Sequence, residues 1–186
     1  SPEAIYSQLV APRQIEEEQK HVYLLWYMDI VNLLKKGEML KIGDRMPEFE
    51  VMDQNGNTVD SNSLIGKRTI IYFYPKDNTS GCTAEACNLR DNHERFIELG
   101  YNVVGVSKDS VASHKKFQEK HQLPFTLLSD PTTGMLQSFG AWGEKKMYGK
   151  TVSGTIRKTF IFNENGILER IIEKVDTKNH AEQILA

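Results

Sequence analysis

A strand followed directly by a cysteine-bearing helix constrains this chain more than any other segment. Residues 69–74 (TIIYFY) form an almost continuous apolar run, which predicts a strand buried on both faces. A polar turn follows, then a helix-type pattern that ends near Gly100, and an apolar run at residues 102–106 predicts a second strand. A strand, a helix and a strand in this order form a β-α-β unit with parallel strands. The segment therefore predicts an α/β fold with a sheet covered on both faces.

The rest of the chain continues this alternation. The pattern predicts helices at residues 110–121, at residues 132–139 and from Lys178, strands at residues 125–129, 157–162 and 167–175, and a loop rich in glycine and lysine at residues 140–154. Before the β-α-β unit, Asn55-Gly56 suits a tight turn and predicts a small hairpin within residues 40–66. This order of elements predicts a thioredoxin-like α/β sandwich, with a central mixed sheet flanked by helices.

Residues 14–36 predict an extra N-terminal helix. Acidic residues lie in its early turns, two lysines lie in its last turn, and Gly37 follows as a stop. Its apolar set is broad, so we expect the helix to be buried, preferably on its own domain and otherwise against a second copy of the chain or another partner. The expected organisation is an N-terminal extension at residues 1–39 and a thioredoxin-like domain at residues 40–186.

Composition argues against several classes of partner. The sequence has 23 Lys and Arg against 25 Asp and Glu, so it has no basic excess that would attract nucleic acid. Its longest apolar run, residues 22–28, is far shorter than the roughly 20 residues that a membrane span needs. No signal-peptide pattern is present, and two cysteines are too few for a disulfide-stapled secreted protein. The expected location is therefore the cytoplasm, without a membrane contact.

The two cysteines of the chain, Cys82 and Cys87, lie in the helix of the β-α-β unit. A free thiol has a pKa of about 8.5 and is only about 3% ionised at pH 7, so a reactive cysteine needs its thiolate stabilised. Cys82 is expected at the start of the helix, where free N–H groups and the helix dipole favour negative charge. The hydroxyl of Thr79 lies three residues earlier, and Pro75 and Gly81 shape the turn. Cys82 is therefore the candidate nucleophile.

The five-residue spacing of the cysteines keeps their side chains apart. In an intact helix, residues five apart have Cα atoms roughly 8.6 Å from each other, whereas a disulfide tolerates no more than about 7 Å. A disulfide between Cys82 and Cys87 therefore requires the first turns of the helix to unwind. We expect Cys82 to attack, to become a sulfenic acid and to be resolved by Cys87.

Other interpretations of these residues are open from the pattern alone. The cysteines also fit inert core residues, whereas zinc is disfavoured because two further ligands are lacking. A thioredoxin-type disulfide reductase would share the fold, but it carries Cys-x-x-Cys and this chain does not. Glu85 either favours the helix dipole alone or contacts Arg157 or Arg90. The five histidines show no ligand spacing and are expected at the surface or at helix caps: His21, His93, His114, His121 and His180.

Residues 75–82 (PKDNTSGC) are similar to the Pro-x-x-x-Thr-x-x-Cys signature of the peroxiredoxins. Cys87, followed by Leu-Arg-Asp at residues 89–91, resembles the bacterioferritin comigratory protein or peroxiredoxin Q subgroup of that family. Further blocks resemble the subgroup in the same order, at residues 127–131 (LLSDP), 142–148 (WGEKKMY) and 157–160 (RKTF). The resemblance covers residues 40–186 and does not account for residues 1–39.

The resemblance implies a thiol-dependent peroxidase that reduces hydrogen peroxide and organic hydroperoxides, uses no metal, haem or other cofactor, and is re-reduced by thioredoxin or a similar dithiol. Carried over position by position, Cys82 is the peroxidatic cysteine and Cys87 is the resolving cysteine. Pro75 shields the site, Thr79 binds the peroxide oxygens, and Arg157 supplies the cation for the thiolate and for the charge that develops as the O–O bond breaks. The chain is expected as a monomer or as a homodimer through its N-terminal helix. The alternative function is a thiol redox sensor that signals to a partner protein.

Overall fold

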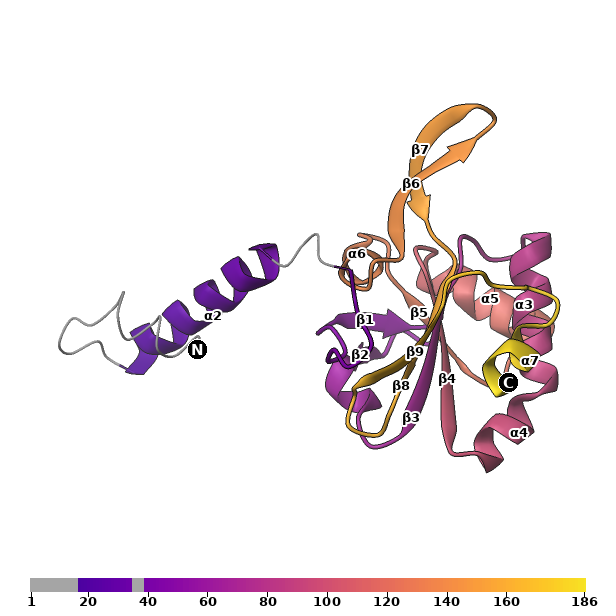
Figure 1. Cartoon of the computed structure of the whole chain (residues 1–186), viewed down its shortest axis with the longest axis horizontal. Helices are drawn as coiled ribbons and strands as arrows, with labels where there is room; N and C mark the ends of the chain where they lie inside the picture. The colour runs from indigo at the N-terminus through magenta and orange to yellow at the C-terminus, as the bar shows by residue number, and fades with distance from the viewer. Residues whose placement is uncertain (1–16, 35–38) are drawn as a thin grey trace. The chain divides into compact units, whose positions relative to one another are not determined.

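The structure, a computed structural model of the chain, describes residues 17–34 and residues 39–186. It separates into two units, residues 1–38 and residues 39–186, which are described one at a time. In the first unit, helix α2 spans Glu17–Leu34, so the predicted N-terminal helix is confirmed over this range (Figure 1). Its predicted first and last residues lie outside the described residues.

The apolar side chains of α2 are largely exposed. Val22, Leu25 and Trp26 keep 64%, 55% and 61% of their surface accessible. The sequence predicts that this helix is buried, but its apolar side chains are not buried within the first unit. The surface that covers them stays a prediction. None of the helices in residues 17–34 and 39–186 is long and apolar enough to cross a membrane.

The second unit is built on a seven-stranded mixed sheet (Figure 1). The strands are β1 (Glu50–Asp53), β2 (Thr58–Asp60), β3 (Arg68–Phe73), β4 (Tyr101–Ser107), β5 (Thr126–Ser129), β8 (Lys158–Phe162) and β9 (Leu168–Ile172). Their order across the sheet is β2-β1-β5-β4-β3-β8-β9, with β3, β4 and β5 parallel and the other pairs antiparallel. The predicted β-α-β unit and central mixed sheet are thus confirmed.

Helices cover both faces of this sheet. They are the 3₁₀ helix η1 (Ser61–Leu64) and the helices α3 (Ser80–Asp91), α4 (His93–Glu98), α5 (Val111–His121), α6 (Gly134–Ser138) and α7 (His180–Leu185). On one face, Ile70 and Tyr72 of β3 pack in a cluster with α3, α4, α5 and α7, and on the other, Ile71 and Phe73 pack with α6 (Figure 1). All four side chains are 0% exposed, as expected when alternate residues of a central strand point into two covered faces.

The helix predicted to run to Gly100 is interrupted at Asn92. This residue caps the end of α3 and the start of α4 with φ −106° and ψ 8°, and its side-chain amide donates to the carbonyl oxygen of Asn88 at 2.9 Å. Asparagine side chains compete with the backbone for such carbonyls, which explains the break. The predicted hairpin around Asn55-Gly56 is confirmed by the antiparallel pair of β1 and β2, and Gly56 supplies the positive φ of 79°.

The predicted loop at residues 140–154 is wrong, because this segment forms a second, two-stranded antiparallel sheet. Strands β6 (Trp142–Met147) and β7 (Lys150–Thr155) pair as a hairpin that projects from the rest of the unit in Figure 1. Tyr148 and Gly149 connect them with φ of 50° and 76°, as a type I′ turn requires. Tyrosine is an unusual residue at positive φ, and the hairpin is mostly exposed, so the sequence lacks the usual turn signal and apolar alternation.

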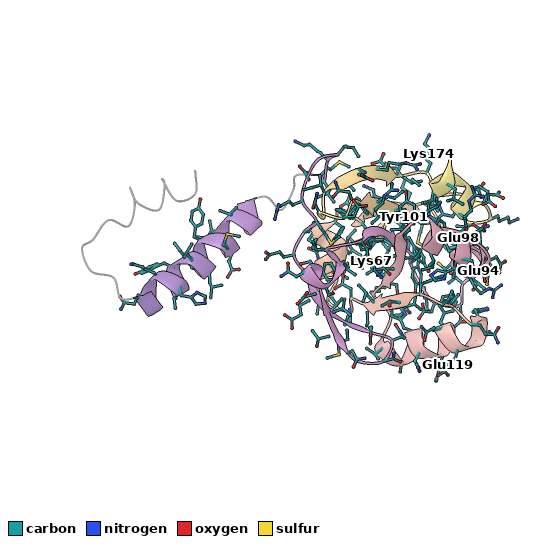
Figure 2. The ribbon with its side chains drawn as sticks, turned by 90° about the horizontal axis from the view of Figure 1, so that it is seen from below. Lys67, Glu94, Glu98, Tyr101, Glu119 and Lys174 are labelled. Carbon is teal, nitrogen blue, oxygen red and sulfur yellow. The ribbon has the colours of Figure 1, made fainter. Side chains whose placement is uncertain are left out.

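The surface of the second unit carries charges of both signs. Lys67, Glu94 and Glu119 are among its exposed charged residues (Figure 2). Arg68 places its guanidinium 4.3 Å from the centre of the Tyr101 ring, in a cation–π contact. This mixture of charges agrees with the net charge of −2 and with the absence of a basic excess in the sequence.

Candidate active site

Cys82 lies in the first turn of α3, at the carboxyl end of β3. Thr79 is the N-cap of the helix, with extended backbone angles of φ −81° and ψ 154°, and Cys82 is the third helical residue. Its side chain is 1% exposed. The helix therefore directs its unpaired N–H groups and the positive end of its dipole toward the region of this thiol.

Arg157 reaches Cys82 from the other side, where the chain passes from β7 to β8. Its Nη2 donates to Cys82 Sγ at 3.1 Å, and its Nη1 donates to Glu85 Oε1 at 2.8 Å. Burial lowers the pKa of Arg157, but Glu85 and Cys82 outweigh this effect and raise the pKa overall. The guanidinium is thus a permanent cation that is shared between a thiol and a carboxylate.

Glu85 is the residue that the sequence left undecided, and the structure places it in contact with Arg157. The carboxyl group is 0% exposed, and burial raises the pKa of Glu85 to about 7, although Arg157 opposes the shift. Within the described residues, Oε2 has no hydrogen-bond partner, and it lies 3.9 Å from Nε2 of the buried His180. Glu85 therefore changes its charge close to neutral pH, one helical turn from Cys82.

His180 lies beneath this group, so the expectation that it is a surface or capping residue is wrong. It is 0% exposed, and its Nδ1 is 2.8 Å from Gln183 Oε1 while its Nε2 is 2.7 Å from Thr159 Oγ1. The Gln183 oxygen only accepts, so Nδ1 carries the proton and Nε2 accepts from the Thr159 hydroxyl. Burial, with a smaller effect of Arg157, lowers the pKa of His180. The ring is accordingly neutral at pH 7.

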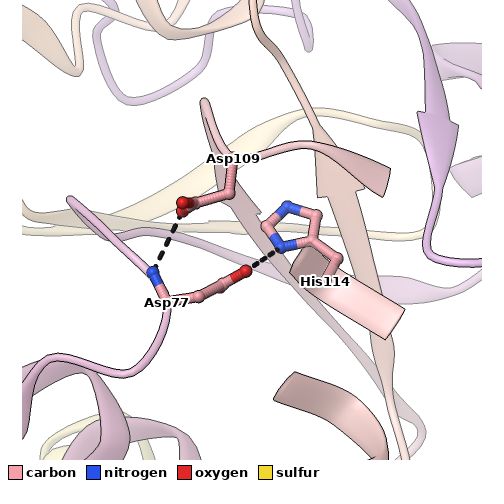
Figure 3. A group of neighbouring side chains, drawn as sticks. All are labelled: Asp77, Asp109 and His114. Atoms are coloured by element: carbon pink, nitrogen blue, oxygen red, sulfur yellow. Dashed lines mark hydrogen bonds and ion pairs between the residues drawn. The ribbon is translucent and has the colours of Figure 1, made fainter. Parts of the chain in front are cut away.

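A buried polar cluster anchors the loop that leads into α3 (Figure 3). Asp77 Oδ1 accepts from the hydroxyl of Tyr74 at 2.7 Å, and Oδ2 accepts from Ser113 Oγ and from His114 Nδ1, both at 2.8 Å. Burial raises the pKa of Asp77, but the hydrogen bond and charge of His114, together with Tyr74 and Ser113, outweigh it and lower the pKa overall. The loop of residues 75–79 is thereby fixed to α5.

His114 is the second histidine for which the surface expectation is wrong. It is 0% exposed, and its Nε2 lies 2.9 Å from the carbonyl oxygen of Leu128 while its Nδ1 faces the Asp77 carboxylate. Both ring nitrogens thus face acceptors, which an imidazolium satisfies and a neutral imidazole does not. The pair is a buried ion pair between the active-site loop and α5.

The same cluster contains the one group of possible metal ligands found among the described residues. One ligand atom each from Asp77, Asp109 and His114 lies within 4.8 Å of the others. Asp109 Oδ2 accepts from the backbone N–H of Asp77 at 3.0 Å (Figure 3). It also accepts from Ser107 Oγ at 2.6 Å. The carboxylate oxygens of this group thus accept hydrogen bonds from protein donors, so the geometry is that of a hydrogen-bonded anchor.

Cys87 lies in the same unbroken helix as Cys82, and both cysteines are free. Its side chain is half-buried, with Sγ 3.9 Å from His121 Nδ1 on α5. Next to it, Asn88 Oδ1 accepts from the backbone N–H of Ala181 at 2.7 Å, which ties α3 to α7. The helix that separates the two cysteines is therefore held on both sides.

Of the residues predicted from the sequence, the structure joins Cys82 and Arg157 directly. Thr79 is exposed, and its hydroxyl donates to the carbonyl oxygen of Lys76 at 3.1 Å, while Pro75 is half-buried at the start of the same loop. Gly81 does not require the absence of a side chain, because an added Cβ would lie 3.6 Å from Arg157 Nη2, an ordinary contact. Of the alternatives that the sequence left open for Glu85, the structure has the contact with Arg157, three residues along α3 from Cys82.

Comparison with known proteins agrees with this architecture. The family model described as the AhpC/TSA family matches residues 42–171. Peroxiredoxin Bcp of Bacillus subtilis is 43% identical over 146 residues, which cover 78% of this chain and 93% of the relative. Peroxiredoxin Bcp of Escherichia coli is 41% identical over 146 residues, which cover 78% of this chain and 94% of the relative.

Solved structures of related proteins share the fold. A mutant of PrxQ from Xylella fastidiosa is 30% identical, covers 80% of this chain and 94% of its own, and superposes with a TM-score of 0.74. The bacterioferritin comigratory protein of Xanthomonas campestris is 34% identical, covers 74% of this chain and 87% of its own, and has a TM-score of 0.70. The chain therefore belongs to the AhpC/TSA family and is a peroxiredoxin of the Bcp or peroxiredoxin Q group.

Proposed function

We propose that this peroxiredoxin reduces hydrogen peroxide and alkyl hydroperoxides with Cys82 and is re-reduced by thioredoxin or a similar dithiol protein. The observation that carries the proposal is the 3.1 Å hydrogen bond from Arg157 Nη2 to Cys82 Sγ at the start of a helix. Alkyl peroxide reduction is the activity described for the related bacterioferritin comigratory protein of Xanthomonas campestris, which supports the substrate class.

In the first step, the thiolate of Cys82 attacks the terminal oxygen of the hydroperoxide. An S–O bond forms, the O–O bond breaks, and the alkoxide or hydroxide leaves and takes up a proton. Arg157 stays paired with the sulfur and also faces the negative charge that develops on the peroxide oxygens, as a pre-positioned cation does in a water-poor site. Thr79 binds the peroxide oxygens once its hydroxyl proton turns away from the carbonyl oxygen of Lys76, and Pro75 covers the loop side of the site.

In the second step, Cys87 attacks the sulfur of the Cys82 sulfenic acid. An S–S bond forms and hydroxide leaves, which yields an intramolecular disulfide and water. Both residues lie within α3, where their Cα atoms are roughly 8.6 Å apart, beyond the limit of about 7 Å for a disulfide. The first turns of α3 therefore unwind for this step, and a dithiol partner then reduces the disulfide.

We assign this chemistry to residues 40–186 and a contact function to the N-terminal extension, residues 1–39. The exposed apolar side chains of α2, including Val22 and Trp26, support a contact with a second copy of the chain. Deletion of residues 1–38 should lower the mass in solution from dimer to monomer and leave peroxidase turnover unchanged. An unchanged mass would contradict the contact function.

The decisive experiment is peroxide-dependent consumption of NADPH with thioredoxin and thioredoxin reductase. Cys82→Ser should abolish turnover, because the nucleophile is removed. Cys87→Ser, a matched loss of a thiol on the same helix, should abolish turnover with thioredoxin yet still form one sulfenic acid per chain. Retained turnover in Cys82→Ser would contradict the mechanism, and a single oxidation without turnover in the wild type would favour a redox sensor instead.

A further inference from the structure

Two groups surround the thiol of Cys87 that the proposed reaction does not yet use. His121, the last residue of α5, places Nδ1 3.9 Å from Cys87 Sγ, and its ring lies edge-on to Phe117 at 5.1 Å between centres. Arg90, one turn after Cys87 on α3, donates from Nη1 to the carbonyl oxygen of His121 at 2.8 Å. The thiol of Cys87 is thus close to the imidazole of His121 and to the guanidinium of Arg90, which is hydrogen-bonded to the backbone of His121.

The thiol of Cys87 has a neutral imidazole and a permanent cation close to it. Burial lowers the pKa of His121, and Lys120 and Arg90 lower it further, so the imidazole is unprotonated at pH 7, the form that a base needs, and it holds an accepted proton only in passing. The pKa of Arg90 is raised, most by its hydrogen bond to Asp91, with a further contribution from the charge of Cys87. A neutral base beside the sulfur and a fixed cation one turn away are the features that activate cysteines elsewhere.

Resting on the proposed function, we infer that His121 is the base that accepts the proton of Cys87 and that Arg90 stabilises the resulting thiolate for attack on oxidised Cys82. The proton passes from Cys87 Sγ to His121 Nδ1. The thiolate then forms the S–S bond as the S–O bond of the sulfenic acid breaks, and the departing hydroxide takes up one proton to give water. His121 returns to its neutral form.

Arg90 also determines how far α3 opens. Its bond to the His121 carbonyl fixes the last turn of the helix to α5, three residues beyond Cys87. When the first turns of α3 unwind, Cys87 moves away from the ring of His121. The guanidinium of Arg90 stays near Cys87, because the two residues are only three positions apart in the chain. The thiolate made in the folded helix therefore keeps its counter-charge during the attack.

Alkylation of Cys87 by iodoacetamide in the Cys82→Ser background tests the activation without peroxide chemistry. His121→Gln keeps a polar side chain but cannot take a proton, and it should slow alkylation at pH 7 at least about tenfold, because the base beside the sulfur is removed. Above about pH 9, where ordinary thiols are largely ionised, the rates should converge. His93→Gln, which removes another half-buried histidine that lies against Phe125, is the matched control and should change nothing.

The second measurement follows the disulfide in the presence of both cysteines. After one equivalent of peroxide and an acid quench, His121→Gln should form the Cys82 sulfenic acid at the wild-type rate and the disulfide about tenfold more slowly at pH 7. Equal alkylation rates, or equal disulfide rates, in wild type and His121→Gln would overturn the inference. The alkylation needs no peroxide, so the two proposals can fail separately. If His121→Gln slows alkylation but the wild type shows no peroxidase turnover, the proposed function is refuted and the role of His121 is not.

Discussion

Replacement of the buried carboxylate next to Cys82 by an amide should remove a large pH dependence of stability. Burial raises the pKa of Glu85 from 4.5 to about 7. Because the folded-state pKa lies above the unfolded one, the stabilising contribution is fully present below pH 4.5 and is lost as the pH rises through 7. The two values differ by about 2.5, and each pKa unit corresponds to about 1.36 kcal/mol, so the loss amounts to about 3 kcal/mol.

The assay is urea unfolding of wild type and Glu85→Gln at several pH values from about 4.5 to 8, with the free energy of unfolding extrapolated to water. The amide cannot ionise, yet its oxygen still accepts the hydrogen bond that Arg157 donates to Oε1. The wild type should therefore lose about 3 kcal/mol relative to Glu85→Gln across this interval. Glu98→Gln, at an exposed position of α4, is the control and should follow the wild type.

A difference between wild type and Glu85→Gln that stays constant across the pH range would refute this reasoning. It would mean that Arg157 compensates the burial of Glu85 fully, so that the pKa of the carboxyl group is the same in the folded and the unfolded state. The same titration in the Cys82→Ser background should give the same slope, because the burial of Glu85 and its bond to Arg157 do not depend on the sulfur.

Three further substitutions test other contacts. Arg157→Lys should slow sulfenic acid formation at least about 100-fold, because an ammonium cannot pair with sulfur and carboxylate together as the guanidinium fork does; a near wild-type rate in stopped-flow measurement would contradict this role. Asp77→Asn should destabilise the fold by about 3–5 kcal/mol at pH 7 in urea unfolding, since it leaves the buried His114 without its counter-charge. The pKa of Asp77 is lowered in the folded state, so the difference in the free energy of unfolding between wild type and Asp77→Asn should shrink as the pH falls through the folded-state pKa. A difference that does not depend on pH would exclude the ion pair as its cause. Gly105→Ala should cost about 1–3 kcal/mol in thermal unfolding, because its Cβ would lie 2.8 Å from the Tyr72 ring, and an unchanged melting temperature would show that the ring moves freely.

Much of the fold follows from the sequence because its central strands are apolar on both faces. The run at residues 69–74 admits one environment, the middle of a covered sheet, and β3 occupies it with every side chain from Ile70 to Phe73 at 0% exposure. The hairpin of β6 and β7 could not be predicted in this way. Its residues face solvent, its pairing depends on backbone hydrogen bonds, and its turn uses Tyr148 at positive φ.

The candidate active site, too, can be predicted from the sequence only in part. The position of Cys82 at a helix start follows from local sequence. Its cation, Arg157, is indicated only by the family resemblance, because the two residues are brought together by the order of the strands in the folded sheet. The buried histidines were missed because their partners, Asp77 and Thr159, are separated from them by 37 and 21 positions. A single sequence carries no spacing signal for such pairs.

The bond between Arg157 and Cys82 joins positions 75 residues apart, and this separation matters during synthesis of the chain. The ribosome releases Cys82 first, while β8, which pairs with β3 and directly follows Arg157, is still to come. Until that strand docks, Cys82 lacks the hydrogen bond that Arg157 donates to its sulfur. Under the proposed mechanism, peroxide therefore oxidises the folded protein in preference to the nascent chain, because Cys82 gains its cation only when the sheet is complete.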